Sequence, residues 1–145
     1  MLPKLILVPT DFSANAEQAL DYACELAAKL GSTVRLVHAV PMPPSALQVA
    51  LPEETLEGLV AEHGVVLERL MAPRRASVSF GEAIIEVGDP RDAIVETTRK
   101  LGADLIIMGT HGRRGLSRVV MGSVAEDVIR HAPCPVLTVR AKAEA

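Results

Sequence analysis

The stretch Leu5-Ile-Leu-Val-Pro-Thr-Asp-Phe-Ser13 contains the pattern that decides the fold of this chain. Its first four residues are aliphatic without polar alternation, which is typical of a strand buried on both faces of a sheet. A turn follows, and apolar residues then recur at helical spacing from about Asn15 to Leu30. Either Ser13 or Asn15 can cap this helix, and Gly31 can end it. A buried strand followed directly by a helix predicts the start of a parallel α/β sheet.

The same alternation of strand and helix continues along the chain. Further strands are expected over 33–40, 76–87 (distorted at Gly81), 104–108 and 135–140, and further helices over 54–71, 90–101 and 116–131. The pattern βαβαβαβαβ predicts a parallel sheet with helices on both faces and right-handed crossovers. No linker or charge block divides the chain, so we expect one domain over residues 1–145, structured over about 3–140.

Composition narrows the classes of function. The 145 residues are 49% hydrophobic but only 2% aromatic, so base stacking is not expected as the main mode of ligand recognition. A net charge of −3 does not favour nucleic acid or an anionic membrane as partner. The apolar run Leu5–Val8 is too short for a signal-peptide core, and no stretch approaches the ~20 apolar residues of a membrane helix. We therefore expect a cytoplasmic protein.

The cysteines and histidines do not indicate a metal or redox site. Cys24 and Cys134 form no CxxC pair, which favours two buried thiols. His38 lies within an apolar strand and is expected to be a core histidine. His63 and His131 are expected on helix surfaces.

Two loops carry residues suited to a ligand: Pro9-Thr10-Asp11 and Gly109-Thr-His-Gly112. Ligands of open parallel sheets bind beyond the carboxyl ends of the strands, where the strand order reverses. If the strands before these two loops are neighbours across that point, both loops face one crevice.

The second loop has the character of a phosphate site. Gly109 and Gly112 permit unusual backbone angles and a close approach to a ligand, and their N–H groups can surround an anion. Gly122-Ser123 begins a helical run, whose free N–H groups can hold phosphate together with the Ser123 hydroxyl. Positive charge is added by Arg113, Arg114 and Arg118.

Structural interpretations of the same residues remain open. The glycines can form a tight turn, and Ser123 with Glu126 fits a capping box. Asp11 suits hydrogen bonds from ribose hydroxyls, but it can also be a turn residue. His111 can reach phosphate or be a solvated loop histidine. Neither a GxxxxGK[ST] nor a GxGxxG motif is present, which disfavours P-loop enzymes and ordinary dinucleotide folds.

Five segments together resemble the universal stress protein family over about residues 3 to 140. They are Val8-Pro-Thr-Asp-Phe-Ser13, Val87-Gly-Asp-Pro90, Asp104-Leu-Ile-Ile-Met-Gly-Thr-His-Gly112, Met121-Gly-Ser-Val124 and Pro133-Cys-Pro-Val-Leu-Thr-Val139. The family's G-x2-G-x9-G-[ST] pattern is matched by Gly109, Gly112, Gly122 and Ser123, which is the pattern of the ATP-binding branch.

The resemblance implies an open five-stranded parallel sheet of order 3-2-1-4-5. This is a Rossmann-like fold of the adenine nucleotide alpha hydrolase-like type, and the implied ligand is ATP, with or without Mg²⁺. Asp11 would hold the ribose. The adenine would be surrounded by Pro9, Thr10, Ala39, Val40 and Met108. The phosphates would be held by Gly109, His111, Gly112, Gly122, Ser123 and Val124.

The resemblance also implies a homodimer formed through the last strand, Val136 to Arg140. The function it implies is a nucleotide-dependent stress-response signalling module that acts on a protein partner. One alternative is a slow ATPase or phosphotransferase that uses His111 or Ser123. A dedicated enzyme is not expected, because no positioned general base can be named. A further alternative is a dimeric interaction module without a ligand.

Overall fold

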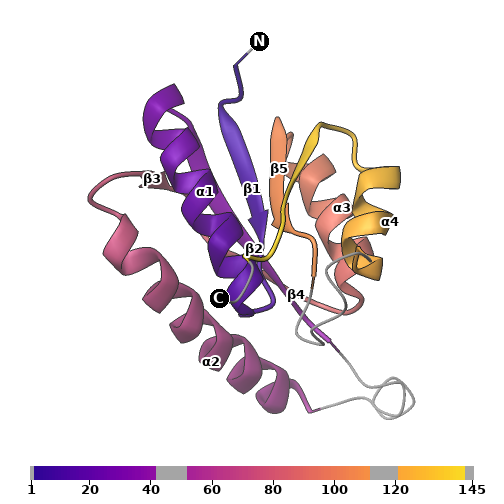
Figure 1. The fold of residues 1–145 in the computed structure, drawn as a ribbon. Helices are drawn as coiled ribbons and strands as arrows, with labels where there is room; N and C mark the ends of the chain where they lie inside the picture. Colours follow the sequence, from indigo (N-terminus) through magenta and orange to yellow (C-terminus); the bar gives the residue numbers. More distant parts are fainter. Residues whose placement is uncertain (1, 42–51, 112–120, 143–145) are drawn as a thin grey trace.

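The structure is a computed structural model that describes residues 2–41, 52–111 and 121–142 (Figure 1). The elements in chain order are β1 (Leu5–Pro9), α1 (Ala14–Leu30), β2 (Thr33–Val40), α2 (Glu53–Met71), the 3₁₀ turn η1 (Ala72–Arg74), β3 (Ser79–Phe80), β4 (Ile84–Val87), α3 (Pro90–Leu101), β5 (Leu105–Gly109), α4 (Ser123–His131) and β6 (Val136–Val139).

The strands form one parallel sheet in the order β3-β2-β1-β5-β6, with β4 also paired to β2. This confirms the order 3-2-1-4-5, except that the third predicted strand is split into two short strands. β1 lies at the centre, between β2 on one side and β5 on the other. The chain leaves β1 in one direction to build β2, β3 and β4, and later returns to build β5 and β6 on the opposite side.

The third strand breaks at Gly81, where distortion was expected. A Cβ atom on Gly81 would lie 2.7 Å from Cγ of Arg35, so the Arg35 side chain packs directly against Gly81. Nε of Arg35 donates a 2.8 Å hydrogen bond to the carbonyl of Glu82. The N–H of Gly81 still donates to the carbonyl of Val34 at 2.9 Å, and regular strand structure resumes at Ile84.

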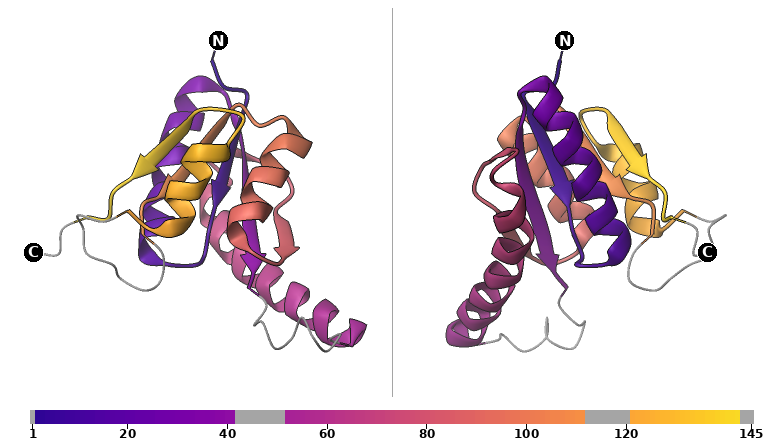
Figure 2. Two further views of the ribbon diagram at one scale, coloured as in Figure 1. Left: turned by 90° about the vertical axis from the view of Figure 1, so that its right-hand side faces the viewer. Right: turned by 60° about the vertical axis from the view of Figure 1, so that its left-hand side comes forward.

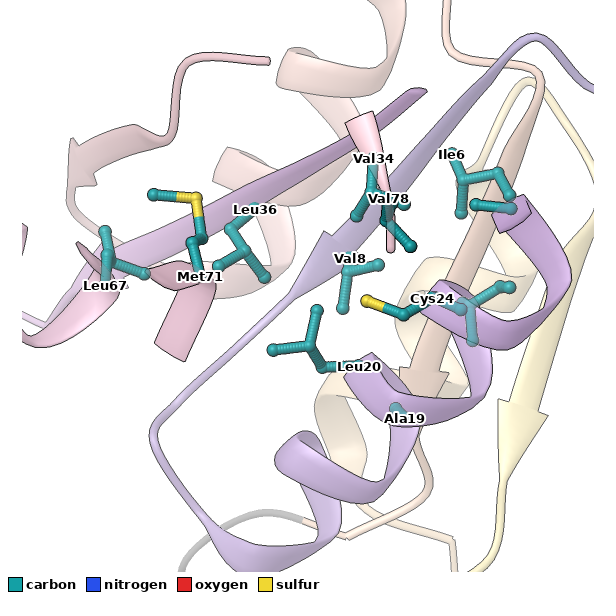
Figure 3. Close-up of a cluster of buried hydrophobic side chains, with 13 residues drawn as sticks. Ile6, Val8, Ala19, Leu20, Cys24, Val34, Leu36, Leu67, Met71 and Val78 are labelled. Carbon is teal, nitrogen blue, oxygen red and sulfur yellow. The ribbon is translucent and has the colours of Figure 1, made fainter. Parts of the chain in front are cut away.

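Helices cover both faces of the sheet, with α1 and α2 on one side and α3 and α4 on the other (Figure 1). Figure 3 shows the cluster on the α1 side, where Ile6, Val8 and Leu20 are fully or almost fully buried. Cys24 lies in this cluster, and burial raises the pKa of its thiol to about 11. The prediction of buried thiols is confirmed for Cys24, whereas Cys134 is half-buried.

The expected helix ends are largely confirmed. Ser13, and not Asn15, caps α1 by accepting a hydrogen bond from the N–H of Ala16 at 3.2 Å, and Gly31 ends the helix with φ of 71°. The last helix differs from its prediction, because α4 begins at Ser123. Residues 116–122 were also expected to be helical. Residues 121 and 122 precede the helix, and residues 116–120 lie outside the described part of the chain.

Within the described residues, α2 is buried only in its C-terminal half. Leu67 and Met71 are its buried residues, and Figure 2 shows the N-terminal half extending past the sheet. Within the described parts of the chain, no helix is long and apolar enough to cross a membrane.

Candidate functional site

The carboxyl ends of the parallel strands meet at one edge of the sheet, the lower edge in Figure 1. β1 and β5 are paired at Ile6↔Leu105 and Leu7↔Ile106, so the loops that follow these two strands are neighbours at that edge. The strand order reverses between β1 and β5. The two loops that sequence analysis selected therefore flank the place where open α/β sheets bind ligands.

The loop after β1 is held by a set of short-range hydrogen bonds. The N–H of Thr10 donates to the carbonyl of Val37 at 2.9 Å and extends the ladder between β1 and β2. Oδ1 of Asp11 accepts a 2.9 Å hydrogen bond from the N–H of Ser13, which confirms the turn interpretation of Asp11. This bond uses one carboxylate oxygen, and Asp11 is only half-buried, so the second oxygen can still accept hydrogen bonds.

A buried histidine lies beneath this loop. His38 is 5% exposed, and its Nδ1 donates to the carbonyl of Thr10 at 2.8 Å, because a carbonyl can only accept. The ring of Phe12, which has φ of 67°, stacks on the His38 ring with centroids 4.1 Å apart. Nε2 of His38 lies 3.0 Å from Nδ1 of His63 on α2. The prediction of a core histidine is confirmed for His38. The prediction of a surface position is wrong for His63, which folding brings against the loop.

The segment after β5 is joined to the start of α4. The carbonyl of Thr110 accepts a 2.7 Å hydrogen bond from the N–H of Gly122. The N–H of Thr110 donates to the carbonyl of Val139 at 3.2 Å, and its Oγ1 lies 2.7 Å from Nδ1 of His111. The structure thus brings Gly109, His111 and Gly122 together. Gly112 and Arg113, together with Arg114 and Arg118, lie outside the described residues.

Gly109 packs closely against a neighbouring side chain, and it does not adopt the unusual backbone angle that was one of its two expected roles. Its φ is not in the left-handed region, so its role does not depend on an unusual backbone angle. A Cβ atom at this position would lie 2.5 Å from Oδ1 and 2.8 Å from Cγ of Asn15. From the sequence, Asn15 was expected only as a helix cap, so this contact was not predicted. A signal was present, because Asn15 lies on the same face of α1 as the buried Ala19 and Ala23.

The start of α4 presents backbone donors that no side chain of the described residues caps. Gly122 is its N-cap and supplies no side-chain cap, while Ser123 is the exposed first helical residue. The capping-box interpretation of Ser123 is therefore wrong, and the N–H of Glu126 instead donates to the carbonyl of Gly122 at 3.1 Å. The first N–H groups of a helix have no partners within the helix and carry partial positive charge, so this end can hold an anion.

Apolar residues flank the same edge. Pro9, Val40 and Met108 are buried, whereas Ala39 is half-buried. Because Pro9 pairs with Val37, the last three residues of β2 extend beyond the end of β1 at this edge. Val124 is half-buried and packs on the core beneath the start of α4. In the described residues no group of three or more His, Cys, Asp or Glu could hold a metal ion.

Comparisons with known proteins agree on one relationship. The model of the universal stress protein family matches residues 3–140. Universal stress protein MJ0531 of Methanocaldococcus jannaschii is 37% identical over 96% of this chain and 83% of its own length. The structure of MJ0577 from the same organism is 33% identical with a TM-score of 0.83, covering 97% of this chain and 98% of that one. A family member from Arabidopsis thaliana, solved with AMP bound, is 20% identical with a TM-score of 0.65, covering 97% and 94%.

Proposed function

This chain belongs to the universal stress protein family, and we propose that it binds ATP in the crevice between the loops that follow β1 and β5. The observation that carries the proposal is the adjacency of β1 and β5 at the point where the strand order reverses. That adjacency brings a partly exposed carboxylate, Asp11, to the same edge as the uncapped start of α4. A sugar diol needs hydrogen-bond acceptors, which Asp11 supplies. A phosphate needs hydrogen-bond donors, which the start of α4 supplies.

Each group of residues has a proposed role. Asp11 accepts hydrogen bonds from the ribose hydroxyls through the oxygen that does not bond to Ser13. The phosphates interact with the free N–H groups and the hydroxyl at the start of α4. The proposed phosphate-binding residues are Gly109, His111, Gly112, Arg113, Gly122, Ser123 and Val124. The proposed adenine-binding residues are Pro9, Thr10, Ala39, Val40 and Met108.

Similarity to other proteins supports an adenine nucleotide as the class of ligand. The Arabidopsis thaliana protein carries AMP, and at 20% identity it shows that this fold accommodates such a ligand. ATP is proposed over AMP because the glycine-spaced pattern and the start of α4 suit several phosphate groups. Measuring ATP binding by calorimetry with and without EDTA would reveal whether Mg²⁺ contributes to the affinity.

The substitution Asp11→Asn tests the proposal without removing the turn. Asparagine keeps a side-chain oxygen for the N–H of Ser13, but it replaces the second carboxylate oxygen with a donor. A lost charged hydrogen bond is worth about 1.5–3 kcal/mol, so calorimetry should show ATP binding weakened about tenfold or more. Glu25→Gln, a matched change at an exposed position of α1, should leave the affinity unchanged. Equal affinities of the parent and Asp11→Asn would refute the assignment of Asp11.

The wider role that we propose is a nucleotide-dependent signalling module of the stress response in the cytoplasm, in which bound ATP presents a surface to a protein partner.

We also propose a homodimer formed through β6. β6 is the last strand of the described sheet, so its outer edge has backbone groups available for pairing. Light scattering on the parent and on Thr138→Pro, which removes a backbone donor from that strand, would test the dimer; two monomeric proteins would refute it.

A further inference from the structure

Asn15 connects three segments at the carboxyl edge of the sheet. Its side chain is 7% exposed, and its Oδ1 accepts a 2.9 Å hydrogen bond from the backbone N–H of His111. Its Nδ2 donates to the carbonyl of Val139 at 3.1 Å and to Oε1 of Gln18 at 3.3 Å. One buried amide therefore joins α1 to the segment after β5 and to the end of β6.

These contacts restrict the backbone that follows β5. Gly109 lies directly against the Asn15 side chain, and the N–H of Thr110 donates to the same Val139 carbonyl that Asn15 contacts. A buried N–H without a partner costs free energy, so the N–H of His111 is held in the direction of Asn15. The orientation of the backbone at His111 in turn sets the direction in which the chain leaves β5.

We propose that Asn15 is a positioning residue for the phosphate groups of the nucleotide. By holding the backbone at His111, it orders the start of the phosphate-binding segment before the ligand arrives. A segment that is already ordered loses less conformational freedom on binding, so affinity increases without any contact between Asn15 and the nucleotide. This inference rests on the proposed function, and it concerns only the phosphate half of the site.

That restriction to the phosphate half supplies the test. Calorimetry on the full chain would compare ATP with adenosine, which shares the base and ribose but has no phosphate. Asn15→Ala should weaken ATP binding about tenfold, the equivalent of one hydrogen bond, and should leave adenosine binding within about twofold of the parent. Gln18→Ala is the matched control, because it removes a partner of Nδ2 but leaves the bond to His111 in place. It should leave both affinities unchanged.

Asn15→Asp is a second variant in case alanine prevents folding. Aspartate keeps an oxygen that can accept from the N–H of His111 and loses the Nδ2 bonds to Val139 and Gln18, so exchange of the His111 amide, followed by NMR, should stay within about threefold of the parent. In Asn15→Ala the same amide should exchange at least about tenfold faster. Fast exchange at His111 in Asn15→Asp would overturn the proposal.

Two other results would also overturn it, and they can be distinguished. If Asn15→Ala changed ATP and adenosine affinity equally, or changed neither, the positioning role would be wrong while ATP binding by the parent remained. If the parent bound neither ligand, the proposed function would be wrong and the positioning role with it.

Discussion

The substitution Gly109→Ala tests the packing at the end of β5. The new Cβ atom would lie 2.5 Å from Oδ1, 2.8 Å from Cγ and 3.2 Å from the backbone carbonyl carbon of Asn15. Asn15 cannot move aside freely, because its amide bonds to His111 and Val139. Either the overlap remains or at least one of these hydrogen bonds breaks. The variant should therefore be less stable than the parent.

The magnitude follows from the contacts. Overpacking costs about 1–3 kcal/mol and a lost hydrogen bond about 1 kcal/mol, while Gly→Ala recovers about 0.4–1 kcal/mol through the unfolded chain. The net loss should be about 1–3.5 kcal/mol. At about 3 °C per kcal/mol for a domain of this size, the melting temperature should fall by about 3–10 °C. Urea unfolding of the parent and the variant would measure the difference in free energy directly.

A control and a double variant isolate the contact. Gly58 lies on the exposed side of α2, and a Cβ atom there would meet nothing within 4 Å. Gly58→Ala should therefore stabilise the protein by about 0.5–1 kcal/mol. In the double variant Gly109→Ala/Asn15→Ala, the colliding Oδ1 and Cγ atoms are absent. Its loss in free energy of unfolding should therefore be at least about 1 kcal/mol smaller than the sum of the losses in the two single variants. Additive costs, or a Gly109→Ala protein as stable as the parent, would refute the reasoning.

Two further substitutions test other contacts of the structure. The N–H groups of Leu5 and Lys4 both donate to Oδ2 of Asp104 at 2.9 Å and hold the pKa of that carboxyl below its ordinary value. The carboxylate therefore stabilises the fold above about pH 4, and this stabilisation is lost as the pH falls through the lowered pKa. Asp104→Asn should therefore melt below the parent at pH 7, with a gap that narrows towards pH 3; a gap independent of pH would contradict this. For His63→Ala, amide exchange should accelerate in the N-terminal half of α2 but not around Leu67 and Met71, which anchor the other half. Glu62→Ala, at an exposed neighbouring position, is the control, and equal acceleration along the whole helix would count against the role of His63.

Much of the fold could be predicted because its signals are local. Leu5–Val8 is apolar on both sides of the strand, and 33–40 is mainly aliphatic, which indicates burial in a parallel sheet before any partner strand is known. The end of α1 is also local, because Gly31 adopts the left-handed conformation that glycine favours. Distortion of the third strand was expected at Gly81, where the strand breaks. The contact of Gly81 with Arg35, a residue of another strand, could not be expected, because local patterns do not connect the two positions.

The candidate site was predicted in part, for the same reason. The two loops were recognised because each follows a strand and carries residues suited to a ligand. The capping-box alternative for Ser123 and the surface position of His63 were wrong, because they depend on where α4 begins and on what α2 packs against. Neither property is contained in the spacing of residues along one segment.

What the sequence alone determined is the order and type of the elements, the parallel sheet and the two ligand-bearing loops. Periodicity and helix caps act within a few residues, so they can be recognised without tertiary structure. Only the tertiary structure decided why Gly109 must be glycine and what Asn15 does. Asn15 and His111 are 96 positions apart, and they meet because strand order and register bring the start of α1 against the end of β5. A contact of that kind depends on the packing of the whole sheet.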